Sequence, residues 1–328
     1  MPSPRYFLAL MLLASIPVHA AESQMFDKMK TYCFGRYLVD VPYEAELKGQ
    51  GNTYLSTTIK TERGGETLLR QKIEKRLNEL KEGKAASERF QFNREIAPSK
   101  KSHLLLGYKE AFGSPMYSID SFKWDRGWIF TTSKGPYDDK RIESIIARFN
   151  DYLKNVRYRS DRETPNEPGF CIENGFIAND GKTSQFERAS ITFSLKKNPD
   201  VWFSVESFVL SKSQPSLLTR IKESKVDSRF PGKIKRVREG LLTINGMAGE
   251  ESLVHFPSDD GTGEAQSFTW ETQGEIGSPL KPSIELAITS GEGVAGVTAA
   301  SSMSTKQIQA LYEAIVKTIR LRPTTETR

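Results

Sequence analysis

The segment RFNDYLKNVRYR at residues 148–159 aligns without gaps on LYEAIVKTIRLR at residues 311–322, and several apolar and basic positions coincide. Both stretches carry apolar residues at helical spacing. These residues are Ile145, Phe149, Tyr152 and Val156 in the first stretch, and Ile308, Tyr312, Ile315 and Ile319 in the second. The pattern predicts that each half of the chain ends in an amphipathic helix packed on a sheet, and hence that the chain is an internal duplication.

The two halves also begin alike. YCFGRYLVDVP at residues 32–42 and GFCIENGFI at residues 169–177 each place a cysteine near a strand-like stretch. In the first half, the spacing of Leu69, Ile73, Leu77 and Leu80 predicts a helix that stops near Gly83, with Leu217, Leu218 and Ile221 as its counterpart. Alternation and aromatic content predict strands at 104–106, 116–124, 128–132, 241–244, 264–270 and 284–288.

These elements predict an α+β fold of two similar domains, each an antiparallel sheet with two helices packed on one face. We place the N-terminal domain at residues 21–164 and the C-terminal domain at 165–328, joined through the linker from Pro165 to Pro168. Two such units either form a cleft with two jaws, suited to gripping a macromolecule, or pack side by side. The sequence leaves both arrangements open.

Residues 1–20 have the pattern of a secretory signal peptide. Arg5 precedes an apolar run from Tyr6 to Ile16, and a small-residue site ends at Ala20. The run is shorter than the roughly 20 residues that span a bilayer. We therefore expect cleavage between Ala20 and Ala21, with release of a soluble periplasmic protein that carries no membrane anchor.

The charge pattern does not favour a nucleic-acid partner. The formal net charge is +6, but basic and acidic residues are interleaved, as in RQKIEKR at residues 70–76. Such interleaving is typical of a solvated helix face. The excess of positive charge is compatible with an acidic protein partner.

The sequence offers no convincing catalytic or cofactor site. It has no Gly-x-Ser-x-Gly motif, and His103 and His255 lie in apolar contexts typical of structural imidazoles. The Asp259-Asp260-Gly261 loop lacks the ligand spacing of a calcium site, and Gly64-Gly65 is not followed by the Lys-Ser/Thr of a phosphate loop. We therefore predict a protein that is not an enzyme, with no catalytic residue, metal or cofactor, although a carboxylate pair could still meet in space.

Cys33 and Cys171 are the two cysteines, and they lie at comparable places in the two repeats. In an oxidising compartment a disulfide between them would clasp the domain starts together and close a loop of about 140 residues. Two buried free thiols, one in each core, are the alternative that the sequence leaves open.

The openings at residues 32–42 and 169–177 resemble the domain starts of the type VI lipase immunity proteins, fourth class, and the order of elements extends the resemblance over the mature chain. The resemblance implies a periplasmic antidote that binds a cognate lipase effector in a 1:1 complex. Its two domains would clasp the cap or lid region and inhibit sterically. Gly35, Arg36 and Pro42 match the motif as fold determinants: a turn, a paired charge and a strand end.

The resemblance supplies no interface residues, so the partner-binding surface is expected only in the cleft and loops between the two domains. Two other functions stay open at this stage. One is a periplasmic hydrolase with an unrecognised carboxylate pair, and the other is an envelope-assembly module that binds through exposed sheet edges.

Overall fold

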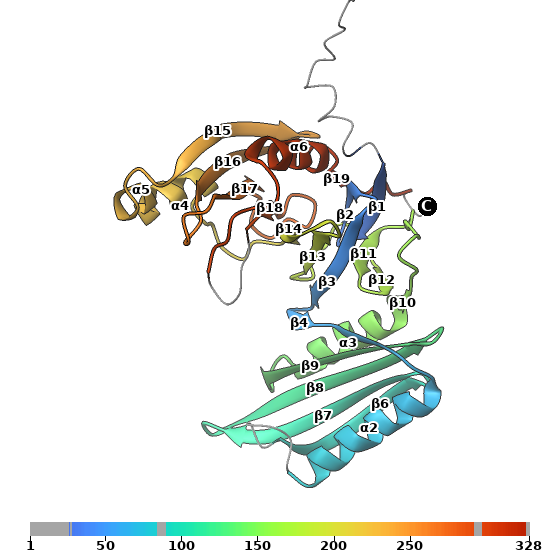
Figure 1. Ribbon diagram of the computed structural model, residues 1–328. Helices are drawn as coiled ribbons and strands as arrows, with labels where there is room; N and C mark the ends of the chain where they lie inside the picture. The colour runs from blue at the N-terminus through green and yellow to red at the C-terminus, as the bar shows by residue number, and fades with distance from the viewer. Residues whose placement is uncertain (1–25, 27, 84–89, 292–296, 326–328) are drawn as a thin grey trace, which may run out of the picture.

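The computed structural model describes residues 26, 28–83, 90–291 and 297–325 (Figure 1). The predicted signal segment and the Ala20–Ala21 cleavage position lie outside these residues. None of the described helices is long and apolar enough to cross a membrane. The elements of the first half are β1 (Met29–Phe34), β2 (Tyr37–Pro42), β3 (Ala45–Tyr54), β4 (Thr57–Thr58), β5 (Lys60–Arg63), α2 (Glu66–Lys81), β6 (Gln91–Ser99), β7 (Ser102–Ala111), β8 (Ser114–Asp125), β9 (Trp128–Asp138), α3 (Ile142–Asn155) and β10 (Val156–Tyr158).

The second half repeats this order, with α5 as an addition and no counterpart of β4. Its elements are β11 (Gly169–Ile172), β12 (Gly175–Ala178), β13 (Arg188–Leu195), β14 (Asn198–Phe208), α4 (Leu217–Ser224), α5 (Val226–Arg229), β15 (Lys235–Ile244), β16 (Met247–Pro257), β17 (Glu264–Thr272), β18 (Ser283–Thr289), α6 (Thr305–Val316) and β19 (Arg320–Leu321). The predicted α+β class with two similar units is confirmed.

The helices begin and end where local chemistry favours it, with one departure from the prediction. The predicted helix at residues 69–80 is confirmed as α2, and Ser304 begins α6 through a capping box with Gln307. The two aligned segments do not stay helical to their ends. Val156 has extended backbone at the start of β10, and Ile319 lies beyond the end of α6. Both side chains are buried, because the chain leaves each helix to enter a sheet.

The helices of each half lie on opposite faces of their sheet, so the prediction that they share one face is wrong. On β7, Leu105 packs with Leu69 of α2, whereas Leu104 and Leu106 belong to the cluster that contains Phe149 of α3. Successive strand residues point to opposite faces, so a run of buried leucines requires cover on both sides. In the second half, α4 and α6 likewise contact opposite faces of the sheet, because Glu250 of β16 accepts a hydrogen bond from α4 and the next residue, Glu251, accepts one from α6.

The sheets are built from strands of both halves. The five-stranded sheet has the order β5-β9-β8-β7-β6 and belongs to the first half alone. The eight-stranded sheet has the order β15-β16-β17-β18-β14-β13-β3-β4, so β3 of the first half pairs with β13 of the second. The opening hairpins exchange partners as well: β19 joins β2, and β10 joins β12. The sheets therefore cross the sequence boundary that we placed between residues 164 and 165.

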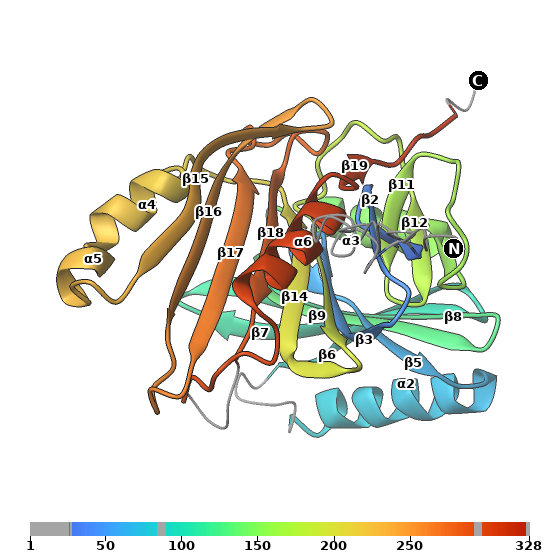
Figure 2. The same ribbon diagram turned by 45° about the horizontal axis from the view of Figure 1, so that its top comes forward.

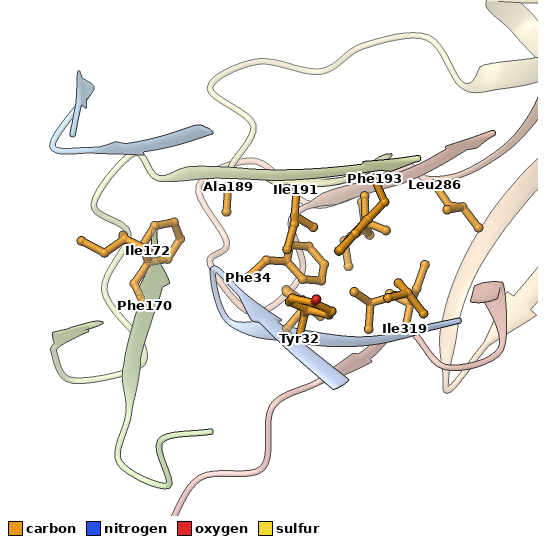
Figure 3. Packing of buried hydrophobic residues seen from close by; sticks show 14 of the residues in the cluster. Tyr32, Phe34, Phe170, Ile172, Ala189, Ile191, Phe193, Leu286 and Ile319 are labelled. Atoms are coloured by element: carbon orange, nitrogen blue, oxygen red, sulfur yellow. The ribbon is translucent and has the colours of Figure 1, made fainter. Parts of the chain in front are cut away.

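One hydrophobic core runs through both halves (Figure 3). Ala189, Ile191 and Phe193 of β13 point toward Tyr32 and Phe34 of the first hairpin. The rings of Tyr32 and Phe193 pack edge to face with centroids 4.9 Å apart, a favourable geometry for aromatic pairs. The same cluster contains residues of α3 and α6. Apolar side chains of each half are therefore buried against side chains of the other half.

A disulfide joins the two opening hairpins between Cys33 and Cys171. Beside it, the amide and carbonyl of Gly35 exchange hydrogen bonds with those of Cys171, at 2.9 and 2.7 Å. Gly35 has a φ of +52°, and a Cβ there would come within 3.1 Å of Ala189 and Phe170. Glycine is therefore required both for the turn conformation and for the close approach of the hairpins.

The other two motif residues have the roles that we inferred for them. Arg36 forms a buried ion pair with Glu187 of the second half, with Nε and Oε1 2.8 Å apart. Removing one partner of such a pair would leave an uncompensated buried charge. Pro42 is the last residue of β2. The paired charge thus links the two halves and does not merely stabilise one turn.

Two buried arginines directly follow the exchanged strands β10 and β19 and bind the neighbouring backbone. Arg159 and Arg322 are the last residues of the two aligned segments, and both donate to main-chain carbonyls. Arg159 donates to Gly175, and Arg322 donates to Glu167 and Gly169 at 2.8 and 3.0 Å. Burial, together with the neighbouring charge of Arg36, lowers the pKa of Arg322 to about 10. The guanidinium is charged at neutral pH and fixes the segment between the halves.

We expect a large loss of stability when the disulfide is removed. In the chain-entropy model, closing a loop of 138 residues restricts the unfolded chain and is worth roughly 4 to 5 kcal/mol. We expect the Cys33→Ser/Cys171→Ser double variant to lose stability on this scale in urea unfolding at equilibrium. Peptide mapping without reductant should recover the Cys33 and Cys171 peptides as one linked species. An unlinked Cys33 peptide from the oxidised protein would contradict the bridge.

A second prediction concerns Arg322. Arg322→Leu leaves buried carbonyls without a donor, so we expect a loss of about 3 kcal/mol in the free energy of unfolding. The matched control is Arg162→Leu, since Arg162 is exposed on the segment between the halves, which Arg322 contacts. The control should stay within about 0.5 kcal/mol of the parent. Equal unfolding midpoints for the two variants would show that the carbonyl contacts contribute nothing.

Candidate functional site

The two histidines in the described part of the chain each contact a glutamate on the neighbouring strand. His103 Nδ1 lies 2.7 Å from Glu95 Oε1, and His255 Nδ1 lies 2.8 Å from Glu264 Oε2. The sheet register brings a carboxylate to each ring. An imidazole fixed between neighbouring strands in this way has a structural role.

In the two loops that resemble ligand sites, the polar groups make hydrogen bonds within the protein. Asp260 accepts hydrogen bonds from Ser258 and Thr262, and these bonds lower the pKa of its carboxyl to about 2. Gly64 accepts a hydrogen bond from the indole of Trp124, and Gly65 begins α2. Within the described ranges, no group of three or more potential ligands could hold a metal ion. Both loops are structural turns.

The two large sheets lie one above the other and are joined through the paired hairpins (Figures 1 and 2). On the side away from the hairpins, the first half presents the β7–β8 turn and the second half presents α4 and α5. A partner that approaches from this side meets elements of both halves. This open side is our candidate partner-binding surface, and we define it by the β7–β8 turn, α4, α5 and the sheet face that α4 contacts.

Four glutamates cross the sheet face on this side in one row. Glu206 faces Glu285 in register, Glu285 faces Glu271, and Glu271 faces Glu250, so the row crosses β14, β18, β17 and β16. Like charges directly opposite each other destabilise a sheet. We call this row the acidic row.

Two arginine side chains, one of them on α4, offset part of the repulsion between the glutamates. Arg220 of α4 donates to both carboxylate oxygens of Glu271, and Arg188 pairs with Glu206. The opposite face carries Glu251, whose carboxylate accepts a hydrogen bond from Tyr312 of α6 at 2.9 Å. These contacts place α4 and α6 on opposite faces of the sheet.

Glu285 is the member of the acidic row whose ionisation the surroundings disfavour. Burial raises the pKa of its carboxyl, and the carboxylates of Glu271 and Glu206 raise it further, while Arg220 lowers it. A partner that supplies a positive charge above the row would relieve this repulsion. The row is invisible in the sequence, because it forms only through the register of four strands.

Exposed apolar side chains flank the acidic row and the open side. Leu241 faces Glu250 in register on β15 and is 85% exposed. Phe112, in the β7–β8 turn, is fully exposed. Neither residue was predicted from the sequence, although the Phe-Gly pair at 112–113 between two strand patterns is a signal for a turn at Phe112. The disulfide pair Cys33–Cys171 lies in the hairpin junction, away from this surface.

Two family models match the chain over most of its length. The model of the Tle cognate immunity protein 4 N-terminal domain matches residues 30–159, and that of the C-terminal domain matches residues 163–324. No curated protein matches the chain. The match therefore extends over both repeats and includes both opening hairpins.

Solved structures of similar proteins cover nine-tenths of this chain. The apo structure of immunity protein TplEi of the T6SS from Pseudomonas aeruginosa is 26% identical, with a TM-score of 0.76, over 90% of this chain and 98% of that one. A chain of the Tle4–Tli4 complex is 27% identical, with a TM-score of 0.79, over 90% and 98%. TplEi complexed with "L" peptide is 25% identical, with a TM-score of 0.75, over 91% and 100%.

The acidic row yields a pH-dependent prediction. Because folding raises the pKa of Glu285, its ionisation destabilises the fold at pH values above the ordinary carboxyl range of about 4.3. We expect Glu285→Gln to stabilise the protein at pH 7 by on the order of 0.5 to 1 kcal/mol, through loss of like-charge pairs. The gain should shrink below about pH 4, where the parent carboxyl is protonated in both states.

The measurement is thermal unfolding of the parent and the variant between pH 3.5 and 8. Glu74→Gln on the exposed face of α2 is the matched control and should leave the midpoint unchanged at every pH. A Glu285→Gln midpoint equal to or below that of the parent at pH 7 would rule out net repulsion in the row.

Proposed function

This chain belongs to the Tle cognate immunity protein 4 family, and we propose that it binds its cognate type VI lipase effector in the periplasm and blocks that enzyme sterically. The resemblance inferred from the two hairpin sequences is thereby confirmed. The protein is an immunity protein and not an enzyme. The observation that carries the proposal is the likeness over nine-tenths of the chain to a structure of the Tle4–Tli4 complex.

The geometry supports steric inhibition. A shared core, exchanged strands and a disulfide fix the two halves relative to each other, so both can contact one partner without a further ordering cost. The open side presents the acidic row and exposed apolar side chains from different halves. We propose that this surface covers the cap or lid region of the effector in a 1:1 complex.

Two features support the periplasm as the place of action. The pattern of residues 1–20 is that of an exported protein. A disulfide that closes a long loop is typical of proteins from oxidising compartments. Protection in the periplasm would place the antidote where a type VI effector injected by a sibling cell meets phospholipid.

The test uses a bacterial host that exports the cognate lipase to its periplasm. We expect the full chain to restore growth, to co-purify with the lipase at 1:1 and to abolish phospholipid hydrolysis in vitro. A variant without residues 2–20 should fail to protect the host. The same variant, purified and oxidised, should still bind the lipase, which separates location from binding. Growth arrest despite export of the full chain, with no binding in vitro, would refute the proposal.

A further inference from the structure

The β7–β8 hairpin ends in a tight turn that carries a phenylalanine. Ala111 and Ser114 pair as the last residues of the ladder, so Phe112 and Gly113 alone form the turn. Their φ angles are +54° and +70°, which is the geometry of a type I′ turn. Type I′ turns favour Asn or Gly at the first position, because a bulky residue is strained there.

The chain uses the favoured residues at another turn of this kind. The β15–β16 hairpin turns through Asn245-Gly246, with φ angles of +47° and +82°. The side-chain amide of Asn245 also donates to the carbonyl of Ile319 at 2.8 Å. Asn245 therefore stabilises the fold as well as forming the turn. Larger residues take the first position of two other tight turns, and each contacts the fold: Leu55 is buried, and Arg126 donates to the carbonyl of Tyr158 at 2.7 Å. Without such a contact, the fold alone would favour asparagine at position 112.

Phe112 gains nothing from the fold in return for this strain. Its side chain is 102% exposed, the highest value among the exposed large apolar residues. Behind the turn, the hairpin is regularly paired: its register is unbroken from Ser102–Lys123 to Ala111–Ser114, and the centroids of the Tyr108 and Tyr117 rings lie 5.7 Å apart. A strained, exposed aromatic on a firm support is typical of a residue retained for binding.

We propose that Phe112 is an anchor that inserts into an apolar pocket of the cognate lipase. This inference rests on the proposed function and adds a specific contact to it. The β7–β8 turn lies on the open side that also presents α4 and α5, so an anchor there can act together with the second half (Figures 1 and 2). An aromatic side chain that is rigidly presented loses little conformational entropy when it is buried.

A membrane is the less favoured target of this side chain. Glu110 lies on the same hairpin and bonds to Tyr108, which places a carboxylate near the turn where anionic headgroups would lie. A single aromatic ring buries too little apolar area for stable membrane binding, which usually needs two signals. A preformed protein pocket requires one well-placed side chain.

The experiment compares full-length parent, Phe112→Asn and Phe112→Ala for affinity to the purified lipase by calorimetry. Phe112→Asn relieves the turn, so its melting temperature should equal or exceed that of the parent. We expect its affinity to fall by about 30-fold or more, the scale of a binding hot spot. Loss of binding without loss of stability cannot arise from misfolding.

Arg126→Asn is the matched control, because Arg126-Gly127 forms a turn with positive φ angles at the other end of the same sheet. Its affinity should stay within about threefold of the parent, a range small beside the expected loss. Replacing Phe112 by p-benzoylphenylalanine should give a light-dependent crosslink to the lipase.

The outcomes separate this inference from the proposed function. Parent-like affinity of Phe112→Asn, with the parent bound, would overturn the anchor while the proposed function stands. A parent that does not bind the lipase would overturn both. Co-sedimentation with phosphatidylethanolamine–phosphatidylglycerol vesicles that Phe112→Asn abolishes, with unchanged affinity for the lipase, would assign the side chain to the membrane and overturn the anchor.

Discussion

The exchange of strands between the opening hairpins is the constraint on which the rest of the structure depends. Strand β19, at the end of the chain, completes the hairpin at its beginning, and β10 completes the hairpin that opens the second half. The disulfide, the Gly35–Cys171 backbone pair and the buried Arg36–Glu187 ion pair all lie at this junction. Neither half can satisfy its own backbone there, so the two repeats form one folding unit.

Much of the interior could be predicted from periodicity, and the exchange could not. The apolar spacing of residues 148–159 and 311–322 predicted the duplication. The spacing is informative because both segments bury their apolar residues in the same core. Strand β3 was missed: its sequence AELKGQGNTY has few large apolar residues, and pairing with β13 determines its place. Local pattern specifies an element but not its partner. The run Leu104-Leu105-Leu106 did contain the information that helices cover both faces of the sheet.

The surface was harder to predict than the core, for two physical reasons. The acidic row needs the register of four strands, and register depends on turns and bulges spread over more than 80 residues. Phe112 departs from the usual chemistry of its turn, so propensity rules lead away from it. Both features oppose stability locally, and the rigid junction allows the fold to tolerate them. Positions where local preference fails are where function is to be sought.

The position of β19 also has a consequence for biosynthesis. Residues 320 and 321 are synthesised long after Leu38 and Tyr37, with which they pair. Until β19 is available, the first hairpin has an unpaired edge. Its long-range contacts form slowly, because closing so large a loop is entropically costly. A polypeptide cut short by failed translation can never complete this sheet. A copy truncated before β19 therefore keeps an unpaired edge on β2, and an unpaired strand edge is a template for aggregation.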